Sequence, residues 1–140
     1  MADIFSPEKR SEVMGKIRGK NTSLELEVFH YLKKRKVYFQ KHYKGAPGSP
    51  DLALPRKKRA VFIDGDFWHG HNFEERKARL TASGQTYWVE KIERNMTRDV
   101  RQNSELLERG WQVLRIWEHR IKRKRDRQEA LDEIEAFLLA

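Results

Sequence analysis

Apolar side chains recur at helical spacing in three stretches of the chain. In the first stretch, Thr22 and Glu25 have the spacing of a capping box, and a helix is predicted behind them. The second stretch predicts a long helix from Thr86 to a C-cap near Gly110, because four apolar residues fall four apart: Trp88, Ile92, Met96 and Val100. The third predicts a closing amphipathic helix whose apolar residues are Leu131, Ile134 and Leu138.

Four runs rich in β-branched and aromatic residues alternate with these helices and predict strands over 37–40, 51–54, 60–64 and 111–117. Residues 55–59 are few enough to form a hairpin turn between the second and third strands. The pattern therefore predicts an α/β fold in which helices pack against a small mixed sheet.

The length of 140 residues suits a single domain, residues 1–140, with one hydrophobic core. Its first part, residues 1–20, is predicted to be a basic arm with a short helix, since Ser6 and Pro7 have the order of a helix start. No apolar run is long enough to cross a bilayer, and we expect a soluble intracellular protein.

The net charge of the chain indicates the class of its binding partner. Thirty Lys and Arg against 21 Asp and Glu leave a net charge of +9, which favours a polyanionic partner, above all nucleic acid. The absence of cysteine excludes disulfides and thiolate nucleophiles. Any metal ion must therefore bind carboxylates, histidines or backbone carbonyls.

Two aspartates stand at the ends of neighbouring predicted strands. Asp51 begins one strand and Asp64 ends the next, so pairing of these strands would bring both carboxylates to one end of the sheet. Hard cations such as Mg²⁺ prefer such oxygen ligands and activate phosphodiesters. Each aspartate alone is more simply a turn or strand-end residue, but the pair is better explained as a metal site.

The segment after Asp64 combines two aromatic residues with histidine. His69 can accept a proton near neutral pH, whereas the pattern alone favours Phe67 and Trp68 as core residues over a DNA-intercalating wedge. On the long helix, Asp99 can orient a histidine or belong to a solvated polar face, and spacing does not decide between these roles. Glu25 is likewise either a capping residue or a metal-site acid.

These residues resemble a known family. Residues 61–71, together with 50–51 before them and 88–99 after them, are similar to the very short patch repair (Vsr) endonucleases. The similarity also covers parts of 10–25 and 110–118, and its most specific part is the Phe-Trp-His block at 67–69.

The resemblance implies a restriction-endonuclease-like fold of the PD-(D/E)xK type. It implies a Mg²⁺-dependent enzyme that nicks one DNA strand beside a thymine mispaired with guanine, the product of 5-methylcytosine deamination. In this reading Asp51 and the backbone carbonyl of Ile63 bind Mg²⁺, and His69 is the general base. Asp99 orients His69, and Glu25 holds a metal-bound water.

The resemblance also reverses the preference for core aromatics. It assigns DNA contact to a set of six residues: Met14, Phe67, Trp68, Trp88, Lys91 and Asn95. Phe67, Trp68 and Trp88 form the wedge in this reading, and Met14 on the basic arm enters from the other groove. A mismatch-repair matchmaker and a repair polymerase are implied as partners of a monomeric enzyme in the bacterial cytoplasm, at the nucleoid.

Two departures from the family pattern stand out. Some relatives carry histidine at position 64, where the aspartate of this chain adds a second metal carboxylate. Relatives often hold a structural zinc through cysteines, and the candidate ligands here are Asp66, His71 and His119. We expect hydrogen bonds rather than zinc at this place.

Two other functions agree with the same residues. One is a sequence-specific or structure-specific DNA nuclease of the same fold, since fold does not determine function. The other is a DNA-binding module without catalysis, in which the acids are structural.

Overall fold

The computed structural model describes residues 23–140, so the predicted helix over 6–18, the basic arm and Met14 lie outside the described residues. In chain order the elements are α2 (Ser23–Lys34), β1 (Gln40–Lys41), β2 (Leu52–Leu54), β3 (Arg59–Asp64), α3 (Phe73–Ala82), α4 (Thr86–Glu108), β4 (Gln112–Trp117), α5 (Glu118–Lys122) and α6 (Lys124–Leu139).

The four strands form one mixed sheet, as predicted, and their order is β1-β2-β3-β4. β1 and β2 pair antiparallel, and β2 and β3 form an antiparallel hairpin that closes with Leu54 opposite Arg59. β3 and β4 run parallel, and α3 and α4 form the crossover between them. This hairpin places the start of β2 beside the end of β3.

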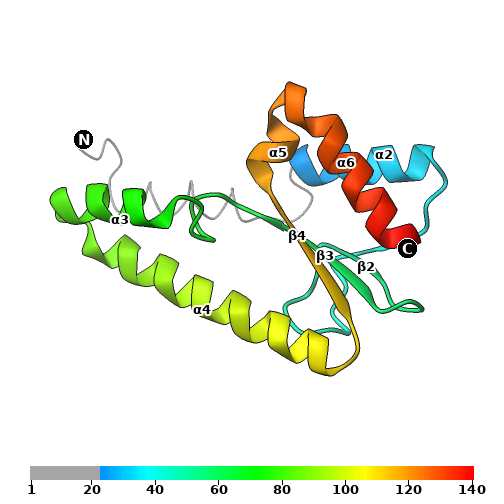
Figure 1. The fold of residues 1–140 in the computed structure, drawn as a ribbon, viewed down its shortest axis with the longest axis horizontal. Helices are drawn as coiled ribbons and strands as arrows, with labels where there is room; N and C mark the ends of the chain where they lie inside the picture. Colours follow the sequence, from blue (N-terminus) through cyan, green and yellow to red (C-terminus); the bar gives the residue numbers. More distant parts are fainter. Residues whose placement is uncertain (1–22) are drawn as a thin grey trace.

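Helices cover both faces of the sheet (Figure 1), and the strands alternate accordingly. Leu52, Leu54 and Val61 face α2, α5 and α6 in the larger core cluster. Ala60 and Phe62 face the other way and pack with Leu106 of α4 and with Trp111. Because β3 is buried on both faces, it reads as a continuous apolar run.

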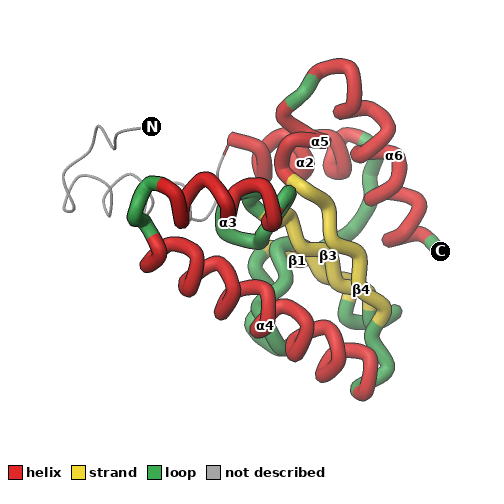
Figure 2. The backbone as a smooth tube through the Cα atoms, turned by 60° about the vertical axis from the view of Figure 1, so that its left-hand side comes forward, coloured by secondary structure: helices red, strands yellow, loops and turns green. Residues whose placement is uncertain are grey.

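One predicted strand boundary was wrong, and two helices were not predicted. The first strand was predicted over 37–40, but β1 starts at Gln40, because the Val37 N–H bonds to the Leu32 carbonyl and completes the end of α2. The helix α3, which has no buried residue, was missed for lack of an apolar stripe. α3 lies against α4 in a helical hairpin (Figure 2). The short helix α5 was also missed.

The other elements predicted within residues 23–140 are confirmed. α4 ends where Gly110, with φ of 85°, donates its N–H to the Leu107 carbonyl and terminates the helix. Residues 124–139 form the closing helix, which buries Leu131, Ile134 and Leu138. Within residues 23–140, no helix combines the length and the apolar character needed to span a bilayer.

Candidate active site

A cleft of about 800 Å³ opens where α2, the loop before β2, the end of β3 and α4 meet. Eight of the predicted site residues line it: Glu25, Asp51, Ile63, Asp64, Trp68, His69, Asn95 and Asp99. The antiparallel pairing of β2 and β3 explains why Asp51 and Asp64 share this cleft. The Ile63 backbone N–H donates a 2.7 Å hydrogen bond to Asp51 Oδ2 and links the two strand ends.

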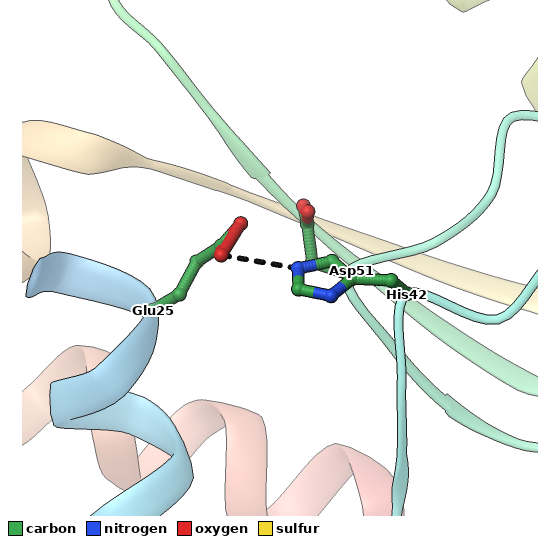
Figure 3. A group of neighbouring side chains, drawn as sticks. All are labelled: Glu25, His42 and Asp51. Atoms are coloured by element: carbon green, nitrogen blue, oxygen red, sulfur yellow. Dashed lines mark hydrogen bonds and ion pairs between the residues drawn. The ribbon is translucent and has the colours of Figure 1, made fainter. Parts of the chain in front are cut away.

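One side of the cleft holds a group of three potential metal ligands, Glu25, His42 and Asp51, whose ligand atoms all lie within 4.8 Å of one another. In Figure 3 the side chain of Glu25 extends from α2 toward His42. His42 Nε2 lies 3.1 Å from Glu25 Oε2. The backbone N–H of His42 also donates to the Asp51 carbonyl at 2.9 Å, so the ring and the aspartate are held as neighbours.

The charge on Asp51 is poorly stabilised by the protein alone. Burial raises the pKa of its carboxyl from 3.8 to about 7, and the negative charges of Glu25 and Asp64 act in the same direction. The hydrogen bond from the Ile63 N–H opposes this shift. A buried carboxylate beside other carboxylates is the environment that a divalent cation stabilises, and the oxygen donors of Asp51 and Glu25 suit Mg²⁺.

The other side of the cleft holds a second group: Asp64, His69 and Asp99. Asp99 Oδ2 lies 2.5 Å from His69 Nδ1, and Asp64 Oδ1 lies 3.7 Å from the same nitrogen. The carboxylate of Asp99 therefore holds the imidazole from α4. Because Nδ1 faces a carboxylate, it carries the proton, and Nε2 is left as the basic nitrogen.

The loop that carries His69 is tightly built. The His69 backbone N–H donates to the Gly65 carbonyl, and Gly70 has φ of 82°. A Cβ at Gly70 would lie only 2.4 Å from Met96 Sδ on α4. A side chain at this position would therefore require Met96 to shift, and it would be strained in the left-handed backbone conformation.

Sequence reasoning missed two residues whose side chains contact acids of the cleft, Arg115 and His42. Arg115 on β4 donates from Nη1 to Asp64 Oδ1 at 3.0 Å and Oδ2 at 3.2 Å, and its guanidinium lies over the Phe62 ring. Burial raises the pKa of Asp64, while His69 and Arg115 lower it. Arg115 looks like one polar position of an alternating strand, and His42 lies in a basic loop, so neither had a local signal.

The three predicted wedge aromatics lie together. Ring centroids are 5.0 Å apart for Phe67 and Trp68, 5.5 Å for Trp68 and Trp88, and 6.3 Å for Phe67 and Trp88. Trp68 is only 4% exposed, whereas Phe67 and Trp88 are half-buried. Trp68 thus has the core position that the pattern alone favoured, with two more accessible rings beside it.

Lys91 and Asn95 of α4 support this aromatic cluster. Lys91 Nζ lies 4.7 Å from the centroid of the Trp68 ring and 5.9 Å from that of Trp88. Asn95 Nδ2 donates to the Trp68 carbonyl at 3.2 Å. The aromatic segment and the His69 loop are therefore both anchored on α4, next to one another.

The three candidate zinc ligands also lie together, but in another arrangement. His119 Nδ1 lies 2.9 Å from Asp66 Oδ1, and the His71 and His119 rings are 4.4 Å apart between centroids. The Asp66 N–H donates to Glu118 Oε1 at 3.2 Å. In the described part of the chain, these three are not among the groups whose ligand atoms all lie within 4.8 Å. The contact between Asp66 and His119 and the tilted ring contact between His71 and His119 connect the His69 loop to α5.

Comparisons with known proteins agree with this geometry. A family model for the DNA mismatch endonuclease Vsr matches residues 2–75. The type II nicking enzyme V.XorIIP of Xanthomonas oryzae pv. oryzae is 39% identical over 118 residues, 84% of this chain and 85% of the relative. V.NmeAIP, a type II nicking enzyme of Neisseria meningitidis, is 37% identical over 134 residues, 96% of this chain and 94% of the relative.

A relative named for mismatch cleavage matches over a similar length. The DNA mismatch endonuclease Vsr of Escherichia coli is 34% identical over 134 residues, which cover 95% of this chain and 85% of the relative. With the family match over more than half of the chain, this identity establishes the relationship. The chain belongs to the Vsr family of DNA endonucleases.

Proposed function

We propose that this endonuclease nicks one strand of duplex DNA beside a T:G mismatch and requires Mg²⁺. The observation that carries the proposal is the meeting of a carboxylate group around Asp51, a carboxylate-held His69 and an aromatic cluster along one cleft. We further propose that the mixed sheet with flanking helices is a restriction-endonuclease-like core, in which strand ends carry the acids.

Asp51 is the principal metal ligand in this proposal, and Glu25 adds a second carboxylate to the same group. The Ile63 carbonyl is proposed as a further ligand. When bound, Mg²⁺ supplies Lewis-acid stabilisation of the negative charge that develops on the phosphodiester. Asp51 binds Mg²⁺ only as a carboxylate, so the Asp51 carboxyl must lose its proton before the ion binds.

His69 accepts the proton of the attacking water on Nε2. Its Nδ1–H donates to Asp99, which fixes the ring and stabilises the imidazolium that proton transfer creates. Attack of the resulting hydroxide on phosphorus then breaks the P–O bond to the 3′ oxygen of the preceding nucleotide, which takes a proton from solvent and leaves as a hydroxyl group. Asp64 contributes a second negative charge near Nδ1, at 3.7 Å, and strengthens the same effect.

The aromatic cluster is proposed to recognise the mismatch. Phe67 and Trp88 present partly exposed rings, and Trp68 lies beneath them, so a wedge from this cluster can enter a weakly stacked base step. Lys91 and Asn95 keep the cluster in place, and the net charge of +9 attracts the DNA backbone.

A nicking assay tests this proposal. End-labelled duplexes containing one T:G pair, or the matched T:A pair, are incubated with Mg²⁺ or with a chelator. Cutting of one strand of the T:G duplex alone, only with Mg²⁺, is the expected result. Equal cutting of both duplexes would remove the mismatch claim and leave a sequence-specific or structure-specific nuclease. Full activity in the presence of the chelator would contradict the proposed requirement for Mg²⁺.

A further inference from the structure

We propose that Arg115 is the built-in cation of the Asp64, His69 and Asp99 group, so that a divalent ion binds only at the Glu25, His42 and Asp51 group. The inference rests on the proposed metal dependence of this endonuclease, and it assigns a role to a residue that had none. It also makes Asp64 a partner of arginine rather than a metal ligand.

The position of Arg115 is held from several directions. Nη1 contacts both carboxylate oxygens of Asp64, and Nε donates to Asn103 Oδ1 on α4 at 2.8 Å. The guanidinium carbon lies 4.1 Å from the centroid of the Phe62 ring. With 17% of its side chain exposed, Arg115 forms part of the cleft wall and cannot swing freely into solvent.

The same guanidinium serves both acids of the group. Nη1 lies 3.7 Å from Asp99 Oδ1 as well as 3.0 Å from Asp64 Oδ1. Arginine keeps its charge at every pH at which proteins fold. A divalent ion between Asp64 and Asp99 would therefore meet a fixed positive charge within contact distance. By holding both carboxylates, Arg115 also acts as a positioning residue for His69.

The two groups differ in the sign of their nearest charges. The ionisable neighbours that perturb Asp51 are Glu25 and Asp64, both acidic. Asp64, in contrast, has Arg115 in direct contact and His69 close by. Among the described residues, a fixed cation thus contacts the Asp64 group, and His42 gives the Asp51 group a nitrogen donor. An imidazole ligand favours Mn²⁺ over Mg²⁺ relative to an all-oxygen site.

The test is a titration of the full chain with Mn²⁺ in the absence of DNA, with free Mn²⁺ measured by its EPR signal. We expect one site. Asp51→Asn should weaken it by about tenfold or more, while Asp64→Asn should change the affinity by less than about threefold. Asn at position 64 keeps an oxygen for Arg115. Two sites in the wild type, or equal losses in the two variants, would overturn the inference.

Removing the arginine tests the converse. Arg115→Met should create a second Mn²⁺ site, and the double variant with Asp64→Asn should lose it again. Arg115→Lys, which keeps the charge, should retain one site. If Arg115→Met binds one ion while its circular dichroism and melting curve stay native, the inference fails; if this variant does not fold, the comparison of Asp51→Asn with Asp64→Asn still decides. Because no DNA is present, the result is independent of which duplex the enzyme cuts.

Discussion

The carboxylate of Asp51 accepts a hydrogen bond from the Ile63 N–H, 2.7 Å away on the neighbouring strand, yet burial raises its pKa to about 7. A single backbone donor therefore does not offset the loss of water and the repulsion from nearby acids. This imbalance leads to a prediction about pH.

Between about pH 4 and 7 the unfolded chain has lost the Asp51 proton while the metal-free folded chain keeps it. The folded state then binds more protons, so its free energy of unfolding falls as pH rises through this window and levels off above about 7. The contribution is on the order of 4 kcal/mol. Urea unfolding of metal-free wild type and Asp51→Asn should show a steeper decline in the wild type; parallel curves would contradict the prediction.

Mg²⁺ binding should have the opposite pH dependence to the stability of the metal-free protein, because the ion binds the deprotonated carboxylate of Asp51. Below about pH 7 its affinity should fall about tenfold for each pH unit. Calorimetric titration of the full chain at pH 6 and pH 7.5 measures this change. An affinity that is the same at both values would show that no proton is displaced from Asp51.

His69→Ala should lower single-turnover nicking by about 10²- to 10⁴-fold, because His69 is the proposed proton acceptor for the attacking water. DNA affinity should change little, since the charge that attracts DNA is spread over the whole chain. Nicking is measured on a labelled T:G duplex and affinity by fluorescence anisotropy. If the variant loses both DNA affinity and the native melting transition, His69 has a structural role instead.

Asp99→Asn keeps the shape of the side chain but removes the charge that holds His69 Nδ1. We expect a loss of at least about 10²-fold in the nicking rate, with the KM for DNA nearly unchanged. Glu93→Gln is the matched control: it neutralises an exposed acid of the same helix that pairs only with Lys77 at 3.8 Å among its described ion pairs. Equal nicking rates for the two variants would show that Asp99 does not support the action of His69.

Phe67→Ala should retain the fold and lower the preference for T:G over T:A about tenfold, if its half-buried ring stacks on a base. Trp68→Ala should instead destabilise the protein by about 3–5 kcal/mol, because that ring is buried. Tyr38→Ala, an exposed aromatic outside the cluster, is the control. The ratio of nicking rates on the two duplexes, together with thermal melts, separates recognition from packing.

Periodicity and composition by themselves determined most of the framework. The spacing of Trp88, Ile92 and Met96 specifies a long helix, and the apolar run before Asp64 specifies a buried strand, since these patterns depend only on which side chains avoid water. The positions of Asp51 and Asp64 at strand ends, the basic charge and the Phe-Trp-His block also indicated a nuclease before any contact was known.

Tertiary structure alone decided which charges are neighbours. His42 reaches Glu25 across 17 residues, and Arg115 reaches Asp64 across 51, distances in sequence over which no local pattern carries information. It also decided that Trp68 is buried beside two more exposed rings. Local sequence specifies the shape of each element, but the energy of a buried charge depends on what the packed elements place beside it.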